Sequence, residues 1–300
     1  MTGPILVTGG SGQVGTELRR LGEAGALDIV APTHGQLDLN DANAIAAFMA
    51  TRSWSAIINA GAYTAVDRAQ DDAVTAWRVN ALAPAALAKV ARDSDIPLIH
   101  LSTDYVFDGA KATPYVEDDP VGPLGVYGAS KEGGEQAVRT TAPRHVILRT
   151  AWVVSPHGSN FVKTMLRLGG ERPHLRVVDD QMGNPTSAAD IAATAAAIAR
   201  RMIVDPAAPC GTYHFVNSGD ATWCGFAREI FALAGARGAT VPSVEAIGSA
   251  DYPTPARRPA NSRLSTAKIA GDYAIAPRPW RAALEEIIDA LLPATTMTET

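Results

Sequence analysis

The sequence predicts an α/β fold in which a doubly wound parallel sheet is joined to a smaller C-terminal lobe. Three observations support this prediction. Short apolar runs alternate with helical patterns through the first half of the chain, a glycine-rich turn directly follows the first apolar run, and the alternation becomes irregular after about residue 150. Such alternation is typical of βαβ units, which build parallel sheets.

The first half of the chain supplies the predicted sheet elements in regular order. Each predicted strand is a short apolar run followed by residues with helical spacing. The predicted strands are residues 5–8, 29–33, 56–59, 98–102 and 145–150, and the predicted helices begin at about Val14 and span residues 42–51, 72–94 and about 127–140. A loop rich in Pro, Gly and Asp, residues 108–125, precedes the last of these helices. We expect these elements to complete a six-strand core in outline.

A phosphate-binding turn is predicted between the first strand and the first helix. Gly9, Gly12 and Gly15 lie in the run TGGSGQVG, which has the position of a Rossmann dinucleotide fingerprint. Gly9 allows the tight turn, Gly12 lets backbone N–H groups approach a pyrophosphate, and Gly15 allows close helix packing. The anion then lies at the positive end of the helix. Segments 38–39 and 60–63 follow the second and third strands, so we expect them to line the adenine and ribose side.

The second half of the chain predicts the smaller lobe. Its predicted elements are strands at 177–178 and 212–216, helices over 188–202, 222–234 and 279–292, and a loop over 252–259. Thr222 or Asp220 is the expected cap of the middle helix, and the polar tail, residues 293–300, is expected to fray. The predicted division is a dinucleotide-binding domain, residues 1–150 with segments near 176–217, and a substrate-binding lobe, residues 151–175 and 218–300.

Composition excludes several classes of protein. The 300 residues carry a formal net charge of −5 and are 47% hydrophobic, which suits one large domain or two unequal ones. No window approaches the roughly 18–20 apolar residues of a membrane span, and Met1 leads almost directly into a strand instead of a signal sequence. Cys210 and Cys224 form neither a metal nor a disulfide pattern. We therefore expect a cytoplasmic protein that binds neither nucleic acid nor membrane.

The end of the second strand predicts the nicotinamide cofactor. In many dinucleotide-binding folds an acid at this position bonds the adenosine ribose and excludes a 2′-phosphate. Here the position reads Thr33-His34, Asp28 comes too early, and Arg19 and Arg20 lie in the preceding helix. The sequence therefore predicts a preference for NADPH, with NADH left open as a second cofactor.

Three residues predict the chemistry of carbonyl reduction. Thr103 ends the fourth strand, and Tyr127 and Lys131 stand four residues apart on the next helix, so they share one face. Hydride addition leaves charge on the carbonyl oxygen, and a positioned acid must supply a proton. Tyr127 is the candidate acid, and Lys131⁺ together with the nicotinamide ring would lower its pKa. Lys131 would also bond the nicotinamide ribose, and Thr103 would hold the carbonyl oxygen. The ordinary alternative is a solvated lysine beside a packed tyrosine.

Other candidate sites have weaker patterns. Tyr105 and Trp152 follow strand ends and are either substrate contacts or core aromatics. The six histidines lack metal-ligand spacing, and the paired acids at 118–119 and 179–180 are expected to be solvated. We therefore predict no metal site.

Beyond these local patterns, the chain resembles the extended short-chain dehydrogenase/reductases along nearly its whole length. Within that family it is most similar to the branch that reduces C4 of a dTDP-linked 6-deoxy-4-hexulose to the rhamnose configuration. The motifs that carry the resemblance are VTGGSGQVG, NAGAYTAVDRAQDD from Asn59, LSTDYVFDG from Leu101, YGASKEGGE from Tyr127, LRTAWVV from Leu148, DDQMGNPTSAADIA from Asp179 and RPANSRL from Arg258. The motifs STDYVFDG and RPANSRL are much narrower signals than the glycine turn.

The resemblance implies a role for each matching residue. Thr103, Tyr127 and Lys131 match the catalytic residues. The sugar-side wall is matched by Asp104, Tyr105 and Trp152. Besides the glycine turn, the matching cofactor contacts are Gln13, Val14, Asp38, Leu39, Ala60, Ala62 and Thr64. The implied partner is a dTDP-linked keto-deoxysugar.

Two features of the resemblance leave alternatives open. Arg258 and Arg263 either meet the substrate diphosphate, which suits guanidinium groups, or anchor the last helix through their loop. Some family members dimerise around a magnesium ion held by glutamates. Glu17 fits one such position, but residues 188–190 read Ala-Ala-Asp. We expect a monomer or a homodimer without bound magnesium.

Two other functions remain open on the same fold, because the fold alone does not decide function. A sugar-nucleotide epimerase or dehydratase would oxidise and then re-reduce its sugar, and Thr103 beside Asp104 permits dehydratase chemistry on paper. A non-catalytic NADP-binding regulatory subunit would keep the cofactor site without turnover. Net consumption of NADPH separates both from a reductase.

Overall fold

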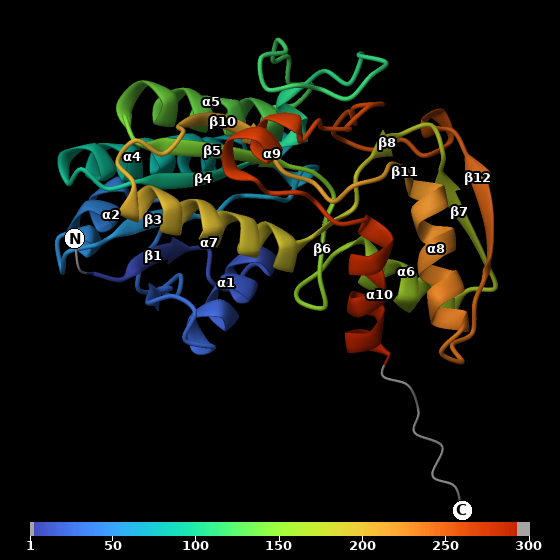
Figure 1. The fold of residues 1–300 in the computed structure, drawn as a ribbon. Helices are drawn as coiled ribbons and strands as arrows, with labels where there is room; N and C mark the ends of the chain where they lie inside the picture. The colour runs from blue at the N-terminus through green and yellow to red at the C-terminus, as the bar shows by residue number, and fades with distance from the viewer. Residues whose placement is uncertain (1–2, 293–300) are drawn as a thin grey trace, which may run out of the picture.

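A parallel sheet with helices on both faces forms the larger part of the molecule, and a smaller lobe lies beyond one end of it (Figure 1). The computed structural model describes residues 3–292. The predicted fold class is therefore confirmed. The tail at residues 293–300, which was expected to fray, lies outside the described residues.

The central sheet has six strands in the order β10-β5-β4-β3-β1-β2, and every neighbouring pair is parallel. The strands are β1 (Ile5–Thr8), β2 (Ile29–Val30), β3 (Ala56–Asn59), β4 (Leu98–Thr103), β5 (His145–Thr150) and β10 (Gly211–His214). The strand order reverses between β1 and β3. In open parallel sheets ligands bind at such a switch point, outside the carboxyl ends of the strands.

Two predictions about this sheet were wrong in detail. Residues up to 150 supply five of the strands, and the sixth, β10, returns to the sheet after the first part of the lobe. The second strand ends at Val30 instead of residue 33. Pro32 explains the early end, because proline has no N–H to donate to a neighbouring strand.

Helices cover both faces of the sheet (Figure 1). On one face α1 (Gln13–Glu23) and α7 (Ala188–Val204) bury their apolar sides against the strands. On the other face α2 (Ala42–Met49), α4 (Ala83–Asp93) and α5 (Val126–Thr141) do the same. These helices confirm the predicted alternation of strand and helix.

The predicted helix over residues 72–94 contains a π-helical segment. It runs as α3 (Ala73–Trp77), the π segment η2 (Arg78–Leu82) and α4. Segments of this kind often occur at functional sites. Here Asn80 lies in η2, and its side chain accepts from the Tyr63 backbone N–H at 2.8 Å and donates to the Tyr63 carbonyl at 3.1 Å. The π segment thereby fixes the loop after β3.

The smaller lobe has its own apolar core. It contains α6 (Phe161–Glu171), α8 (Trp223–Gly235), α10 (Trp280–Leu291) and a parallel pair, β7 (His174–Val178) with β12 (Ser243–Ile247). Short pairs link the lobe to the sheet: β6 (Val153–Val154) with β9 (Thr186–Ser187), and β8 (Met182–Gly183) with β11 (Ala221–Thr222). Short 3₁₀ turns lie at Arg68–Gln70, Asp104–Val106 and Ser249–Asp251.

Three details of this part differ from or refine the predictions. The strand predicted at 177–178 pairs with β12 and not with the central sheet. Helix α9 (Ala267–Tyr273) packs on the core of the larger part through Ile269, although it comes late in the chain. Thr222 is confirmed as the cap of α8, since its hydroxyl accepts from the Gly225 N–H at 2.9 Å.

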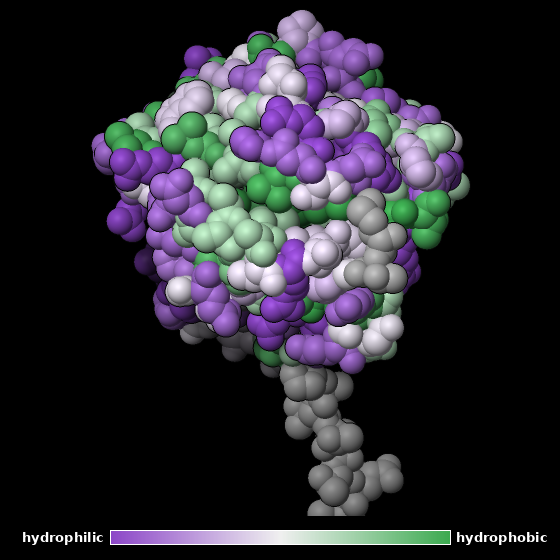
Figure 2. Space-filling view, turned by 90° about the vertical axis from the view of Figure 1, so that its left-hand side faces the viewer, coloured by the Kyte–Doolittle hydropathy of each residue, from purple (hydrophilic) through white to green (hydrophobic). Residues whose placement is uncertain are grey.

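Hydrophilic residues dominate the outline of the face shown in Figure 2, and apolar residues gather towards its centre. This face is the left-hand side of the view in Figure 1, away from the smaller lobe. Among the described residues, none of the helices has the length and apolar character needed to cross a membrane.

Candidate active site

The glycine turn after β1 has the backbone geometry that a dinucleotide fingerprint requires. Gly9 has φ +70°, and a Cβ there would lie 2.6 Å from the Gly61 Cα. A Cβ at Gly15 would lie 2.1 Å from the Gly9 carbonyl oxygen. Gly12 donates its N–H to the Gly9 carbonyl at 2.9 Å and precedes the first residue of α1. Side chains at Gly9 and Gly15 would therefore destroy the turn.

A cavity of about 250 Å³ lies against this turn at the β1/β3 switch point. It brings together four of the predicted cofactor contacts, Gly9, Asp38, Leu39 and Ala62. The other residues that line it are Thr8, Gly10, Ser11, Pro32, His34, Leu37, Asn40, Gly61, Tyr63, Thr75 and Val79. The cradle and the cavity fit the adenosine half of a dinucleotide.

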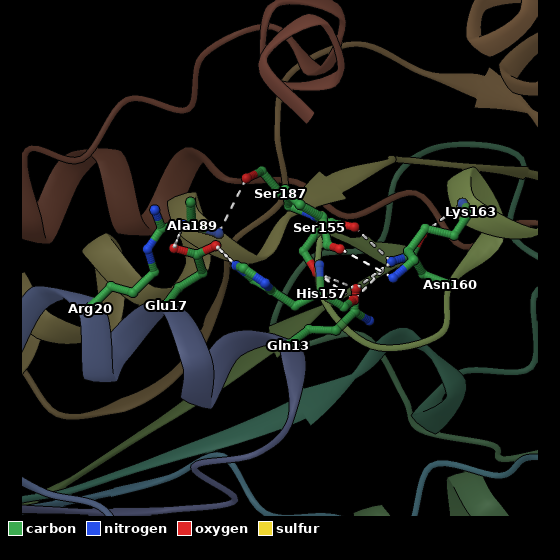
Figure 3. A network of polar contacts seen from close by, with 10 residues as sticks. Gln13, Glu17, Arg20, Ser155, His157, Asn160, Lys163, Ser187 and Ala189 are labelled. Atoms are coloured by element: carbon green, nitrogen blue, oxygen red, sulfur yellow. Dashed lines mark hydrogen bonds and ion pairs between the residues drawn. The ribbon is translucent and has the colours of Figure 1, made fainter. Parts of the chain in front are cut away.

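The remaining predicted cofactor residues do not line this cavity. They are Gly12, Gln13, Val14, Gly15, Ala60, Thr64, Tyr127 and Lys131. Val14 is buried in the core. Gln13 directs its side chain away from the cavity, accepting from Ser155 Oγ at 2.7 Å and from Asn160 Nδ2 at 2.9 Å (Figure 3). Their contacts with a cofactor stay a prediction.

Arg19 and Arg20 differ in their distance from the cavity. The Arg19 side chain passes 3.5 Å from the position of a Cβ on Gly10, which itself lines the cavity. Arg20 faces Glu17 at 3.6 Å. The Arg19 stem therefore passes beside Gly10, while its guanidinium lies 3.7 Å from the Glu23 carboxylate.

Thr103 and Asp104 form a buried polar pair at the carboxyl end of β4. Thr103 is 6% exposed and Asp104 is 3% exposed. The Thr103 hydroxyl donates to Asp104 Oδ1 at 2.9 Å. Burial raises the pKa of Asp104 to about 6, although hydrogen bonds from Ser262 and Thr103 lower it in part. This carboxyl is therefore much easier to protonate than an exposed aspartate.

Tyr127 lies in the first turn of α5, next to the end of β4. Gly128 permits this close approach, because a Cβ there would lie 2.1 Å from the Tyr105 carbonyl oxygen. The two phenol rings meet edge to face, with centroids 5.4 Å apart. Burial raises the pKa of Tyr127 to about 12, and the nearby Thr103 hydroxyl partly opposes this rise. At neutral pH the phenol is protonated and available as a donor.

Lys131 lies one helical turn further along α5 and is 2% exposed. Its Nζ donates to the Leu101 carbonyl oxygen at 2.6 Å. Burial lowers the pKa of Lys131 to about 8, which the Glu135 carboxylate partly opposes. Within the protein burial raises the pKa of Tyr127, and the lowering that we expect from the ammonium together with a bound nicotinamide ring stays a prediction. The ammonium is directed at a strand carbonyl, which limits its effect on the phenol.

A buried ion pair beneath Lys131 was missed by sequence reasoning. Glu135, fully buried, accepts from Arg149 Nε at 2.9 Å and from Arg149 Nη2 at 2.7 Å. Arg149 also stacks over the Phe107 ring, 4.9 Å from its centroid. The signal was available, because an arginine within the apolar run of β5 needs a buried partner.

The predicted substrate residues differ in their positions and in their contacts within the chain. Tyr105 and Trp152 lie at the carboxyl edge of the sheet, beyond β4 and β5. Arg258 donates to Asp67 Oδ2 at 2.7 Å, and its positive charge also acts on Tyr105. Arg263 donates to Asn261 Oδ1 at 2.8 Å and also bonds the Ala112 carbonyl and Asp220. The contacts of Arg263 fit the loop-anchor alternative.

The carboxylates considered for magnesium are engaged within the chain. His157 Nε2 lies 2.9 Å from Glu17 Oε1 (Figure 3), and Asp190 receives Arg278 Nε at 2.9 Å. Within residues 3–292, the structure places no group of three or more His, Cys, Asp or Glu side chains suited to hold a metal ion.

Comparison with known proteins identifies the family. A family model described as the RmlD substrate binding domain matches residues 1–292. The chain is 42% identical to a dTDP-4-dehydrorhamnose reductase of Sinorhizobium fredii, over 96% of this chain and 97% of that protein. The chain belongs to the dTDP-4-dehydrorhamnose reductase family. The resemblance seen in the motifs is thereby confirmed.

Solved structures of the reductase family share this fold closely. The crystal structure of a dTDP-4-dehydrorhamnose reductase from Clostridium acetobutylicum matches with a TM-score of 0.89 and 34% identity, over 96% of this chain and 99% of that chain. A family member from Bacillus anthracis, solved in complex with NADP, matches with a TM-score of 0.87 and 31% identity over the same shares.

Proposed function

We propose that this protein reduces the C4 keto group of dTDP-4-dehydrorhamnose (dTDP-4-dehydro-6-deoxy-L-mannose) to give dTDP-L-rhamnose, with NADPH as the reductant. One observation carries the proposal: Thr103 and Lys131 are buried, Tyr127 is half-buried, and all three lie where the carboxyl end of β4 meets α5. The membership of the reductase family supports it.

Each of the three residues has a separate role in carbonyl reduction. When bound, NADPH supplies the hydride that reaches C4. Tyr127, protonated because burial raises its pKa to about 12, gives its proton to the developing alkoxide. Thr103 places its hydroxyl beside the same oxygen and stabilises the charge that forms there. Lys131 holds a positive charge in the buried site and orients the cofactor ribose.

The preference for NADPH is part of the proposal. Asp38, the carboxylate at the cavity, accepts from the Asn40 N–H at 2.8 Å, and this bond lowers its pKa. Asp38 follows the end of β2 by several residues, so it does not occupy the position that excludes a 2′-phosphate. Arg19 supplies a cation beside Gly10 for that phosphate.

The test is to incubate the protein with NADPH and dTDP-4-dehydrorhamnose and determine the configuration at C4 of the product by NMR. We expect one NADPH oxidised for each dTDP-L-rhamnose formed. Conversion of the sugar without net NADPH consumption would favour an epimerase or dehydratase. Tight NADPH binding without turnover would favour a regulatory subunit. Size-exclusion chromatography of the same sample distinguishes a monomer from a homodimer.

A further inference from the structure

Trp152 has an unusual backbone conformation at the edge of the site. It lies two residues beyond Thr150, which pairs with Thr103 in the sheet. Its φ is +45°, in the left-handed region that residues other than glycine rarely adopt. Non-glycine residues in this region concentrate at functional sites, where the surrounding structure holds them.

One face of the Trp152 indole is covered by another tryptophan. The rings of Trp152 and Trp223 lie 3.5 Å apart between centroids and are tilted by only 10°. Trp223 also packs against Phe161, at 4.6 Å between ring centroids. The Trp223 Nε1 donates to Gln181 Oε1 at 3.2 Å, which fixes the rotation of this ring.

The other face of the indole is covered by Gly183. A Cβ on Gly183 would lie 2.4 Å from Trp152 Cε2 and 2.7 Å from both Cζ2 and Nε1. A point that is nearer to Cε2 than to the bonded atoms Cζ2 and Nε1 lies above the ring plane, because a point at the ring edge would be nearer to those two atoms. Because Trp223 occupies one face, Gly183 occupies the opposite one. Only glycine permits this contact.

Trp152 therefore presents an edge, not a face, to a bound molecule. Among residues 3–292, its indole N–H has no protein acceptor, and Nε1 is not one of the buried polar atoms without a partner. That N–H consequently remains accessible. Strand β8, which contains Gly183, is linked to the site through Ser262. The Ser262 N–H donates to the Met182 carbonyl at 2.7 Å, and the Ser262 side chain bonds Asp104.

We propose that Gly183 and Trp223 are positioning residues that clamp both faces of Trp152, so that its indole N–H is offered to the sugar nucleotide as a hydrogen-bond donor. This inference rests on the proposed function. It assigns specificity for the sugar nucleotide to two residues outside the predicted site. It also means that Trp152 recognises its ligand by a directed hydrogen bond and not by stacking on the sugar ring.

The experiment measures binding of dTDP-L-rhamnose by calorimetry in the presence of NADP⁺, together with KM and kcat. Trp152→Phe keeps an aromatic ring but removes the donor, and we expect about tenfold weaker sugar-nucleotide binding. Gly183→Ala and Trp223→Ala should weaken it by a similar factor, with NADPH affinity unchanged. Trp223→Phe should stay within about twofold of the wild type, since its ring still covers the face.

Gly170→Ala is the matched control, because Gly170 lies in the same lobe with open space at its Cβ position. Its binding should equal that of the wild type. Each variant's unfolding midpoint is measured as well, and Trp223→Ala tests the clamp if Gly183→Ala does not fold.

Wild-type sugar-nucleotide affinity in Trp152→Phe would overturn the donor role, and wild-type affinity in both Gly183→Ala and Trp223→Ala would overturn the clamp. Neither result contradicts the proposed function as long as the wild-type protein reduces the dTDP-linked sugar. Failure of the wild type to bind or reduce any dTDP-sugar would overturn both proposals.

Discussion

Glu135 and Arg149 form a two-bonded ion pair, at 2.9 and 2.7 Å, one helical turn beyond Lys131 and shielded from solvent. This pair joins α5, which carries the proposed acid, to β5, which leads to Trp152. The rigid connection between the two halves of the site therefore depends on a charge pair within the core. Such pairs are costly to break, because the remaining charge stays buried.

Glu135→Gln should lower the free energy of unfolding by about 3 kcal/mol at neutral pH, because the Arg149 cation loses its counter-charge. Urea denaturation monitored by circular dichroism measures the change. Glu171→Gln removes the carboxylate of a comparable Arg–Glu pair, Arg167–Glu171, whose members are 60% and 51% exposed. That variant should change stability by less than about 0.5 kcal/mol. Equal effects of the two variants would contradict this role of the buried pair.

Tyr127→Phe should lower kcat by about 10²–10⁴-fold while NADPH affinity stays nearly constant, because the proton is needed mainly in the transition state. Lys131→Ala should lower both kcat and NADPH affinity. Tyr105→Phe is the control, since it removes the hydroxyl of the neighbouring ring and should reduce kcat far less. Steady-state kinetics and cofactor titration by fluorescence provide the measurements. An unchanged kcat in Tyr127→Phe would refute the assigned acid.

Gly9→Ala should abolish cofactor binding, because the new Cβ would lie 2.6 Å from the Gly61 backbone in a turn with φ +70°. Gly25→Ala separates backbone strain from this clash. Gly25 has a similar φ of +73°, but its Cβ position has no neighbour within 4 Å. We expect Gly25→Ala to cost about 1 kcal/mol of stability and to leave NADPH affinity unchanged. Isothermal titration with NADPH tests both variants, and full affinity in Gly9→Ala would contradict the role of the turn.

Arg19→Ala should raise KM for NADPH by about tenfold or more and leave KM for NADH unchanged, because only NADPH carries the 2′-phosphate. Arg20→Ala, whose guanidinium faces Glu17, should leave both values close to wild type. Initial rates with each cofactor at fixed sugar concentration give the four constants. A parallel loss with NADPH and NADH would show that Arg19 does not select the phosphate.

Asp104→Asn should stabilise the protein at pH 7.5 by up to about 3 kcal/mol, because burial raises the pKa of Asp104 to about 6 from 3.8. The folded state holds this proton more tightly than the unfolded state, so the wild type loses stability as pH rises from about 4 to about 6. The gain from the substitution should therefore vanish below about pH 4. Urea unfolding across this pH range measures it.

The opposite sign is expected for Asp180→Asn. Hydrogen bonds from Ser249 lower the pKa of Asp180, so its carboxylate stabilises the folded state above the unfolded pKa and loses this effect in acid. The same denaturation series should show a small loss of stability at pH 7.5. A gain there would contradict the sign derived for Asp180.

Predictions from local sequence patterns were correct where a short segment determines its own conformation. The strands at Ile5–Thr8, Ala56–Asn59 and His145–Thr150 match their predicted bounds, because each is a short apolar run buried by helices on both sides. The glycine turn has the predicted conformation at Gly9 for the same reason, since the constraint is steric and local. The sequence also placed Thr103, Tyr127 and Lys131 in one region, and all three occur there.

Long-range contacts were not predictable in the same way. The sequence indicated that segments near 176–217 return to the larger domain, but not that β10 pairs beside β5 or that β7 pairs with β12, because pairing between strands far apart depends on how the whole chain folds back. The partner of Arg149 and the ring that covers Trp152 were missed for the same reason. Sequence reasoning also did not anticipate that burial raises the pKa of Tyr127.

By itself, the sequence determined the fold class, the phosphate-binding turn and the residue types needed for carbonyl reduction, since these depend on periodicity, glycine sterics and helical spacing within short stretches. The tertiary structure decided which groups lie together in the interior. It places Lys131 near the Glu135 carboxylate, buries the carboxyl of Asp104, and packs the Trp152 indole between Gly183 and Trp223. Desolvation and face-to-face packing arise only when distant segments meet, so no local pattern encodes them.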